Sequence, residues 1–220
     1  MKNLFVILLF GLVLTQGCKE EDLCLIGSGS VNEYQLDLDE FENVTLMGPI
    51  NLRIKQGPGS EVMVEAEAEI FSQLSYSVKS RTLEIGFKGN VTCFETDYGV
   101  WVNVTVPDIE TIISSGVSDI ISDGDLDLDM LVLDISGTSN VELSGRVSDQ
   151  MIESSGVLNA KNFELITENT EINVSGIAEL EITCNEHLDI DVSGAATVSY
   201  KGYPTINQEV SGSLNLINAN

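Results

Sequence analysis

Basic residues are scarce in this chain, and histidine is almost absent. Ten Lys and Arg stand against 35 Asp and Glu, so the formal net charge is −25 at pH 7. Binding to DNA or RNA needs Lys and Arg in quantity to neutralise phosphates, so this composition argues against a nucleic-acid partner. His187 is the only histidine. Multi-histidine metal sites are therefore excluded, and any histidine-based catalytic triad would have to use this residue.

Long apolar runs are also missing, apart from a short one at the start of the chain. Residues 4–14, directly after Met1-Lys2-Asn3, are apolar except for Gly11. A helix needs about 20 apolar residues to span a bilayer, so this run is too short for a transmembrane segment. It has the length of the apolar region of a secretory signal. Residues 1–17 are therefore predicted to be a signal peptide.

The signal ends in a segment that resembles a bacterial lipobox. In the sequence Leu14-Thr15-Gln16-Gly17-Cys18 a small residue precedes the cysteine. In a lipobox the cysteine becomes the new N-terminus and carries acyl chains, and several chains together hold a protein stably on a membrane. This predicts an outer-membrane protein anchored only through lipid on Cys18. An ordinary secretory signal that is cleaved nearby is the alternative.

The residues behind Cys18 bear on which way the protein faces. Lys19-Glu20-Glu21-Asp22 resembles the surface-export signal of Bacteroidetes lipoproteins. This resemblance implies a protein that faces the cell exterior. The alternative is that residues 18–30 form only a solvated acidic tether.

Three further cysteines remain, and an exported protein is in a compartment where a disulfide persists. Cys24 and Cys93 both lie near Gly-rich or irregular segments, and we predict that they form a disulfide. Cys184 is in phase with the apolar residues Leu180 and Ile182, which predicts a buried free thiol. A nucleophilic role would need an activating base. His187 is three residues away, a spacing that places the two side chains on opposite faces of a strand.

The chain after residue 30 carries no sustained helical period. Apolar and polar residues alternate with period two over 35–39, 82–87 and 100–106, a pattern typical of half-buried strands. Residues 56–60 (Gln-Gly-Pro-Gly-Ser) predict a turn between two strands. The fold is therefore predicted to be all-β.

A Ser-Gly pair recurs after Pro107 at spacings of 21, 19, 20, 18 and 18 residues, a mean of about 19. An apolar residue stands four positions after each glycine, and another stands four positions before it in every pair but the last. Such a repeat of strands alone predicts a parallel β-helix, or β-solenoid, with rungs of about 19 residues over 108–220. The pairs are Ser115-Gly116, Ser136-Gly137, Ser155-Gly156, Ser175-Gly176, Ser193-Gly194 and Ser211-Gly212.

These pairs are expected to be the corners of the rungs. Glycine permits a tight bend or a positive φ that a Cβ would obstruct. The serine hydroxyls can hydrogen-bond along their column or back to the turn. A ligand-binding serine ladder is the alternative to a purely structural corner.

Residues 33–216 also resemble a known family. The resemblance is carried by the order and spacing of segments 43–57, 62–66, 82–85 and 102–107, followed by the Ser-Gly rungs. The chain is similar to the "putative auto-transporter adhesin, head GIN domain" family. The resemblance implies an exported β-helical lipoprotein and supplies no catalytic residues. Residues 31–107 would be the N-terminal, strand-rich part of the domain, which either continues the coil or packs as its cap.

The densest acidic run, 123–129, invites a Ca²⁺ interpretation because hard cations prefer carboxylate oxygens. An EF-hand loop needs Gly at its sixth position and Glu at its twelfth. Counted from Asp125, those positions are Met130 and Ser136. The alternation instead predicts that Leu126 and Leu128 point inward below a solvated aspartate stripe.

Trp101 is the only tryptophan, and it alternates with Val100 and Val102. It therefore faces the opposite way, where it either stacks on a glycan or covers the N-terminal sheet. Tyr200 and Tyr203 form a second candidate near the last rungs.

These observations together predict a lipid-anchored, surface-exposed, non-enzymatic protein without a cofactor or a metal. A protein or glycan partner is expected on the acidic solenoid face. The alternatives are a periplasm-facing structural or stress-related lipoprotein and a carbohydrate-active enzyme.

Overall fold

The computed structural model describes residues 23–89 and 91–220. The predicted signal peptide and Cys18 lie outside the described residues. The described chain is almost entirely strand, with one short helix, α1 (Ala68–Phe71), which is neither long nor apolar enough to cross a membrane. The strands are β1 (Leu23–Ile26), β2 (Val31–Leu36), β3 (Asn43–Met47), β4 (Asn51–Gln56), β5 (Glu61–Glu67), β6 (Leu74–Lys79), β7 (Thr82–Phe87), β8 (Val91–Glu95), β9 (Trp101–Val106), β10 (Thr111–Ser114), β11 (Val117–Ser122), β12 (Leu126–Ile135), β13 (Thr138–Glu142), β14 (Gly145–Ser154), β15 (Val157–Val174), β16 (Ile177–Val192), β17 (Ala195–Lys201), β18 (Thr205–Val210) and β19 (Ser213–Asn218).

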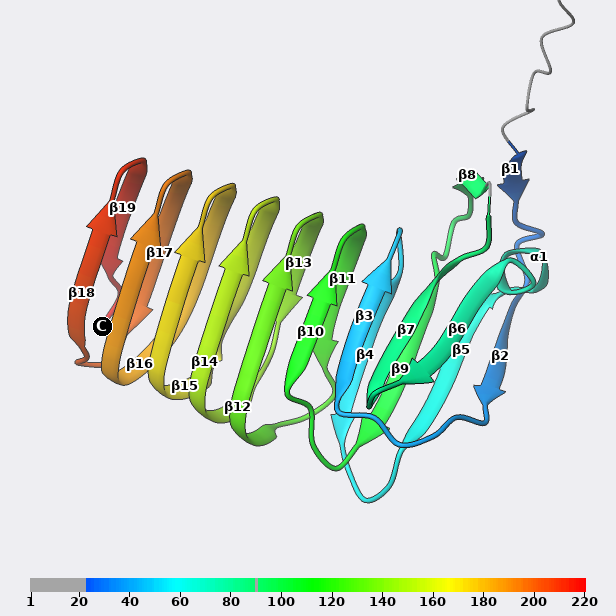
Figure 1. Cartoon of the computed structure of the whole chain (residues 1–220), viewed down its shortest axis with the longest axis horizontal. Helices are drawn as coiled ribbons and strands as arrows, with labels where there is room; N and C mark the ends of the chain where they lie inside the picture. Colours follow the sequence, from blue (N-terminus) through cyan, green and yellow to red (C-terminus); the bar gives the residue numbers. More distant parts are fainter. Residues whose placement is uncertain (1–22, 90) are drawn as a thin grey trace, which may run out of the picture.

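The C-terminal half is a parallel β-solenoid, as the repeat predicts. Each rung lies beside the next in a row along the long axis of the molecule (Figure 1). The register follows the Ser-Gly spacing: Ile112 pairs with Leu133, and Leu133 pairs with Ile152. The same column continues through Ile172 and Ile190 to Gln208 in the last rung.

The apolar residues of the repeat form the core. The column four positions after each glycine is fully buried in the inner rungs, and Leu180 at its centre is 0% exposed. The two columns are therefore the inner walls of the coil. In the last rung Leu216 is only partly buried, and Gln208 is exposed, because this rung has a neighbour on one side alone.

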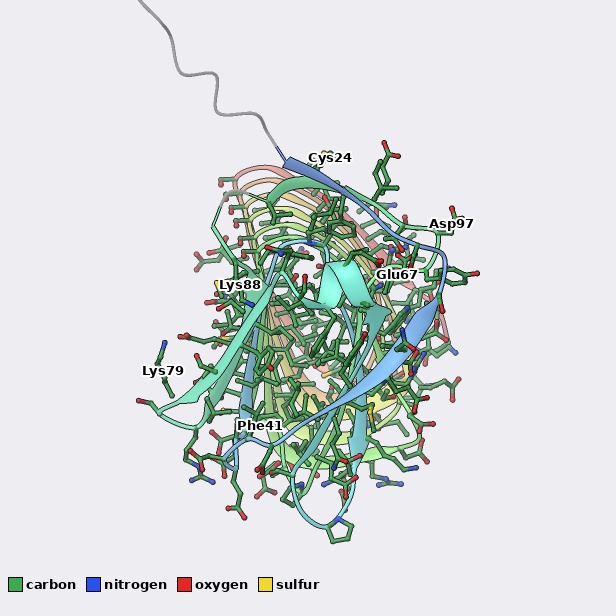
Figure 2. The ribbon with its side chains drawn as sticks, turned by 90° about the vertical axis from the view of Figure 1, so that its right-hand side faces the viewer. Cys24, Phe41, Glu67, Lys79, Lys88 and Asp97 are labelled. Atoms are coloured by element: carbon green, nitrogen blue, oxygen red, sulfur yellow. A yellow bond between two sulfur atoms is a disulfide. The ribbon has the colours of Figure 1, made fainter. Side chains whose placement is uncertain are left out.

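The N-terminal part both continues the coil and caps it. Strands β3 and β4 pair in parallel with β10 and β11 on one side and with β7 and β9 on the other. The stacking order therefore differs from the sequence order, because β7 and β9 follow β3 and β4 in the chain but lie outside them. Strands β2, β5 and β6 pair antiparallel and, with α1, close this end of the solenoid (Figures 1 and 2).

Two of the three strands predicted from alternation match the structure closely. Residues 82–87 form β7, residues 100–106 form β9 from Trp101 onward, and the turn over 56–60 joins β4 to β5. The strand expected over 35–39 instead ends at Leu36. Leu36 pairs with Val62, the second residue of its antiparallel partner β5, so the residues after Asp37 have no part of β5 opposite them.

The corner glycines differ from the prediction in one respect. None of the six Ser-Gly glycines has a positive φ. The reason for glycine is close approach: a Cβ on Gly156 would overlap the carbonyl oxygen of Gly137 in the rung below, and the other five corners have the same relation to the preceding glycine. At Gly116 that preceding residue is Gly48, so the glycine column extends into the N-terminal part.

Candidate functional site

The corner serines make no hydroxyl ladder along the described rungs. The Ser115 hydroxyl donates to the carbonyl oxygen of Leu46 in β3, the neighbouring strand of the stack, at 3.3 Å. A cluster of hydroxyl–hydroxyl contacts instead lies inside the coil, where the Oγ of Ser118 is 2.8 Å from the Oγ atoms of both Ser114 and Ser139. Sequence analysis missed this buried cluster, which satisfies polar groups among apolar columns. The geometry supports a structural corner.

One face of the solenoid concentrates carboxylates, and we refer to it as the acidic face. It is formed by β12, β14, β18 and the second halves of β15 and β16. Residues in one column of parallel rungs are about 4.8 Å apart, so like charges there repel. Asparagines in adjacent rungs donate to some of them: the Nδ2 of Asn207 donates to Asp189 at 2.7 Å, and the Nδ2 of Asn169 donates to Asp149 at 2.8 Å. The carboxylates of the acidic face are Asp134, Asp149, Glu153, Glu171, Asp189, Asp191 and Glu209.

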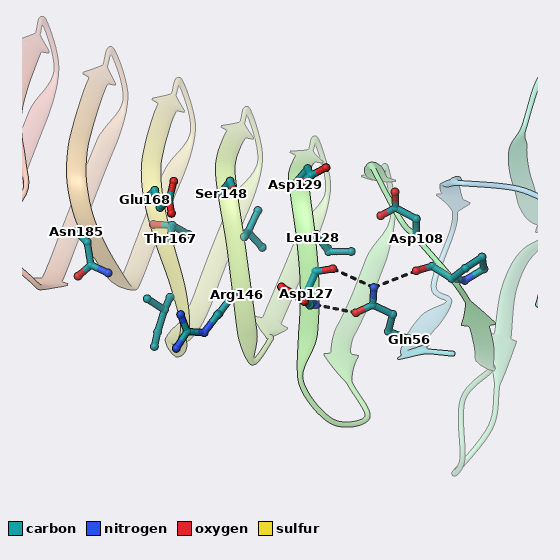
Figure 3. A pocket seen from close by; sticks show the side chains of 13 residues that line it. Gln56, Asp108, Asp127, Leu128, Asp129, Arg146, Ser148, Thr167, Glu168 and Asn185 are labelled. Atoms are coloured by element: carbon teal, nitrogen blue, oxygen red, sulfur yellow. Dashed lines mark hydrogen bonds between the residues drawn. The ribbon is translucent and has the colours of Figure 1, made fainter. Parts of the chain in front are cut away.

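A hollow of about 410 Å³ lies where the acidic run crosses the rungs (Figure 3). The side chain of Gln56 joins two segments of its wall. Its Nε2 donates to the carbonyl oxygens of Pro107 and Asp127, each at 3.0 Å. Arg146 is the one basic residue among those that line it. The lining acids are Asp108, Asp127, Asp129 and Glu168.

The acidic run itself is a solvated stripe. Leu126 and Leu128 are buried, whereas Asp125, Asp127 and Asp129 are exposed, as the alternation predicts. No group of three metal-ligating side chains is found in the part of the chain that the structure describes.

The cysteines lie in two places. Cys24 and Cys93 are joined by a disulfide that ties β1 to β8 (Figure 2 labels Cys24). Cys184 is a buried free thiol. Its Sγ lies 3.0 Å from the carbonyl oxygen of His187, while the imidazole of His187 is exposed on the other face of the strand. The geometry therefore gives this thiol no histidine base.

Alkylation without reduction tests this cysteine assignment. We expect exported protein to label at most at Cys184, and slowly, because a buried thiol reacts only when the structure opens. Mass spectrometry of the labelled peptides measures it, with a reduced and unfolded sample as the control that labels all three cysteines. Free labelling of both Cys24 and Cys93 in folded, exported protein would contradict the disulfide.

Trp101 faces away from the core, as predicted, since Val100 and Val102 are fully buried on the opposite side. Its ring is half-buried, and the guanidinium carbon of Arg53 lies 4.6 Å from the ring centroid. Glu65 on β5 is its antiparallel neighbour. Sequence analysis missed both partners, because a pairing between distant strands leaves no mark in a local pattern.

The described chain is a capped β-solenoid. Its parallel rungs are stacked, one end is closed by a cap, and polar columns are exposed on its surface. Residues 40–204 match the family described as "Putative auto-transporter adhesin, head GIN domain", and the chain belongs to this family. The resemblance seen in the sequence is thereby confirmed.

Crystal structures of similar proteins support the same fold. A putative adhesin from Bacteroides fragilis has a TM-score of 0.70 at 19% identity, covering 88% of this chain and 100% of that one. A putative lipid binding protein from Parabacteroides distasonis has a TM-score of 0.60 at 18% identity, covering 89% and 100%. A putative adhesin from Parabacteroides merdae has a TM-score of 0.55 at 17% identity, covering 88% and 99%. The comparison with curated proteins found no match.

Proposed function

We propose that this chain is a lipid-anchored, non-enzymatic interaction protein on the outer face of a bacterial outer membrane. Membership of an adhesin family supports an interaction role. The observation that carries the proposal is the placement of the two ends. Strand β1, which follows the predicted anchor at Cys18, lies at the capped end, and the rungs extend away from it (Figure 1). An anchor there leaves the solenoid free to meet a partner.

The acidic face is the surface that we assign to a partner protein or glycan. Its columns continue over several rungs without interruption by a loop, so they offer an extended, regular surface. A net charge of −25 attracts a basic partner at long range and accelerates its association. A basic protein patch or an amino-bearing glycan fits this face best.

The anchor is tested by Cys18→Ala. We expect this change to move the protein from the membrane fraction to the soluble fraction, because the acyl chains supply the membrane affinity. Fractionation and immunoblotting measure the distribution. Cys184→Ala is the matched control and should still sediment with membranes, since Cys184 is a buried core residue. Sedimentation of the Cys18→Ala protein with membranes would rule out the lipid anchor.

Orientation is tested by protease treatment of intact cells. A surface protein is expected to disappear from intact cells while a periplasmic marker survives. Full protection in intact cells, with digestion after lysis, would contradict surface display and support the periplasm-facing alternative.

A further inference from the structure

A second hollow, of about 450 Å³, lies beside Trp101 in the N-terminal part. Small-molecule sites fall in a range of about 300–1,000 Å³, so its size suits a ring-sized ligand. Two aromatic side chains, Trp101 and Tyr98, line it together with the carboxylate of Glu65. The backbone of residues 29–31 forms another wall. Aromatic and polar groups therefore converge on one concave surface.

Glu65 connects the wall of this hollow to a polar network that lies beside it. Arg53 Nη1 donates to Asn103 Oδ1 at 2.6 Å, and Asn103 Nδ2 donates to Glu65 Oε1 at 2.7 Å. The guanidinium carbon of Arg53 also lies over the Trp101 ring, 4.6 Å from its centroid, as in a cation–π contact. Among the described residues, the second oxygen of Glu65 has no protein donor. It is free to accept a hydrogen bond from a ligand.

The two loops that wall the hollow are held in place before any ligand arrives. Thr96 Oγ1 accepts hydrogen bonds from the backbone N–H groups of Tyr98 and Gly99, at 3.1 and 3.2 Å. The other loop is pinned by Glu67, which is 1% exposed and accepts from the N–H of Gly29 at 2.5 Å (Figure 2). A preorganised site loses less entropy on binding.

We propose that this hollow binds the ring of a neutral sugar. The apolar C–H face of a pyranose suits the electron-rich face of an aromatic ring, and its hydroxyls can donate hydrogen bonds to the carboxylate of Glu65. Glu65 and the net charge of −25 disfavour uronic and sialic acids. The inference rests on the proposed function, because a displayed protein of this family would meet such a sugar on a glycan outside the cell.

Trp101 is the only tryptophan of the chain, so its fluorescence reports on this site alone. Tryptophan fluorescence of the folded protein is titrated with methyl hexopyranosides and N-acetylhexosaminides, and with methyl glucuronide as the acidic comparison. We expect a saturable change with at least one neutral glycoside and a much weaker response to the glucuronide. Tyr98→Ala and Glu65→Gln should each weaken binding by about tenfold, the equivalent of one lost contact.

Tyr203→Ala is the matched control, because Tyr203 is an aromatic residue that is 88% exposed far from this hollow, and its loss should leave the affinity unchanged. Tyr98 is itself 55% exposed on a loop, so its variant should fold, as circular dichroism can verify. The proposal is overturned if no neutral glycoside gives a saturable change. It is equally overturned if calorimetry shows unchanged affinity for Tyr98→Ala and Glu65→Gln. The protease treatment of intact cells does not depend on these titrations. A failure to bind sugar would therefore leave the proposal of surface display unaffected.

Discussion

Gly156→Val is expected to destabilise the solenoid by about 3 kcal/mol or more, the upper part of the range for overpacked interiors. A Cβ at this corner would overlap the carbonyl oxygen of Gly137 and lie 2.7 Å from that of Ser136. The Gly137 oxygen cannot move aside freely, because it accepts a hydrogen bond from Val157 N at 2.8 Å. Both obstacles are backbone, so no side-chain rotation relieves them.

Chemical denaturation followed by circular dichroism measures this loss. Gly212→Val is the matched control, since it meets the same overlap with Gly194 but lies in the last rung. A terminal rung can separate from its one neighbour, so the cost there should be smaller. A Gly156→Val protein as stable as wild type would mean that the rungs do not stack at these corners.

Leu180→Ala is expected to cost about 2–5 kcal/mol, as for other large-to-small core changes. Leu180 is 0% exposed and lies between Ala160 and Val198 in its column. Truncation places two alanines in adjacent rungs. The backbone on both sides is held in register by strand pairing, so the cavity cannot collapse easily.

Glu179→Ala is the matched control for this core change. Glu179 is exposed one position before Leu180 on the same strand, and its truncation should change the free energy of unfolding by no more than about 0.5 kcal/mol. Denaturant titration of both variants compares them directly. Equal stabilities would show that the inward and outward assignment of β16 is wrong.

The solenoid could be predicted from the sequence because equivalent residues of successive repeats pair with one another when the rungs stack in register. The spacings between Ser-Gly pairs reappear as the pairing register of Ile112 with Leu133 and of Leu133 with Ile152. The period-two alternation likewise placed Leu126 and Leu128 inside. The corner glycines lie at bends where a Cβ would be obstructed, as expected, but the positive φ offered as one reason was wrong, because a local sequence cannot distinguish a positive φ from a close approach by the neighbouring rung.

The sequence by itself determined the all-β class, the rung period and the buried columns, which depend on alternation or repetition along the chain, and the acidic character of the surface, which depends on composition. Tertiary structure alone decided that β7 and β9 stack outside β3 and β4. It also decided the surroundings of Trp101, which receives Arg53 from β4 and Glu65 from β5. Those partners are set by how a non-repeating, partly antiparallel cap folds back on the coil. Contacts between distant segments of that kind follow from packing in three dimensions and leave no periodic trace in the chain.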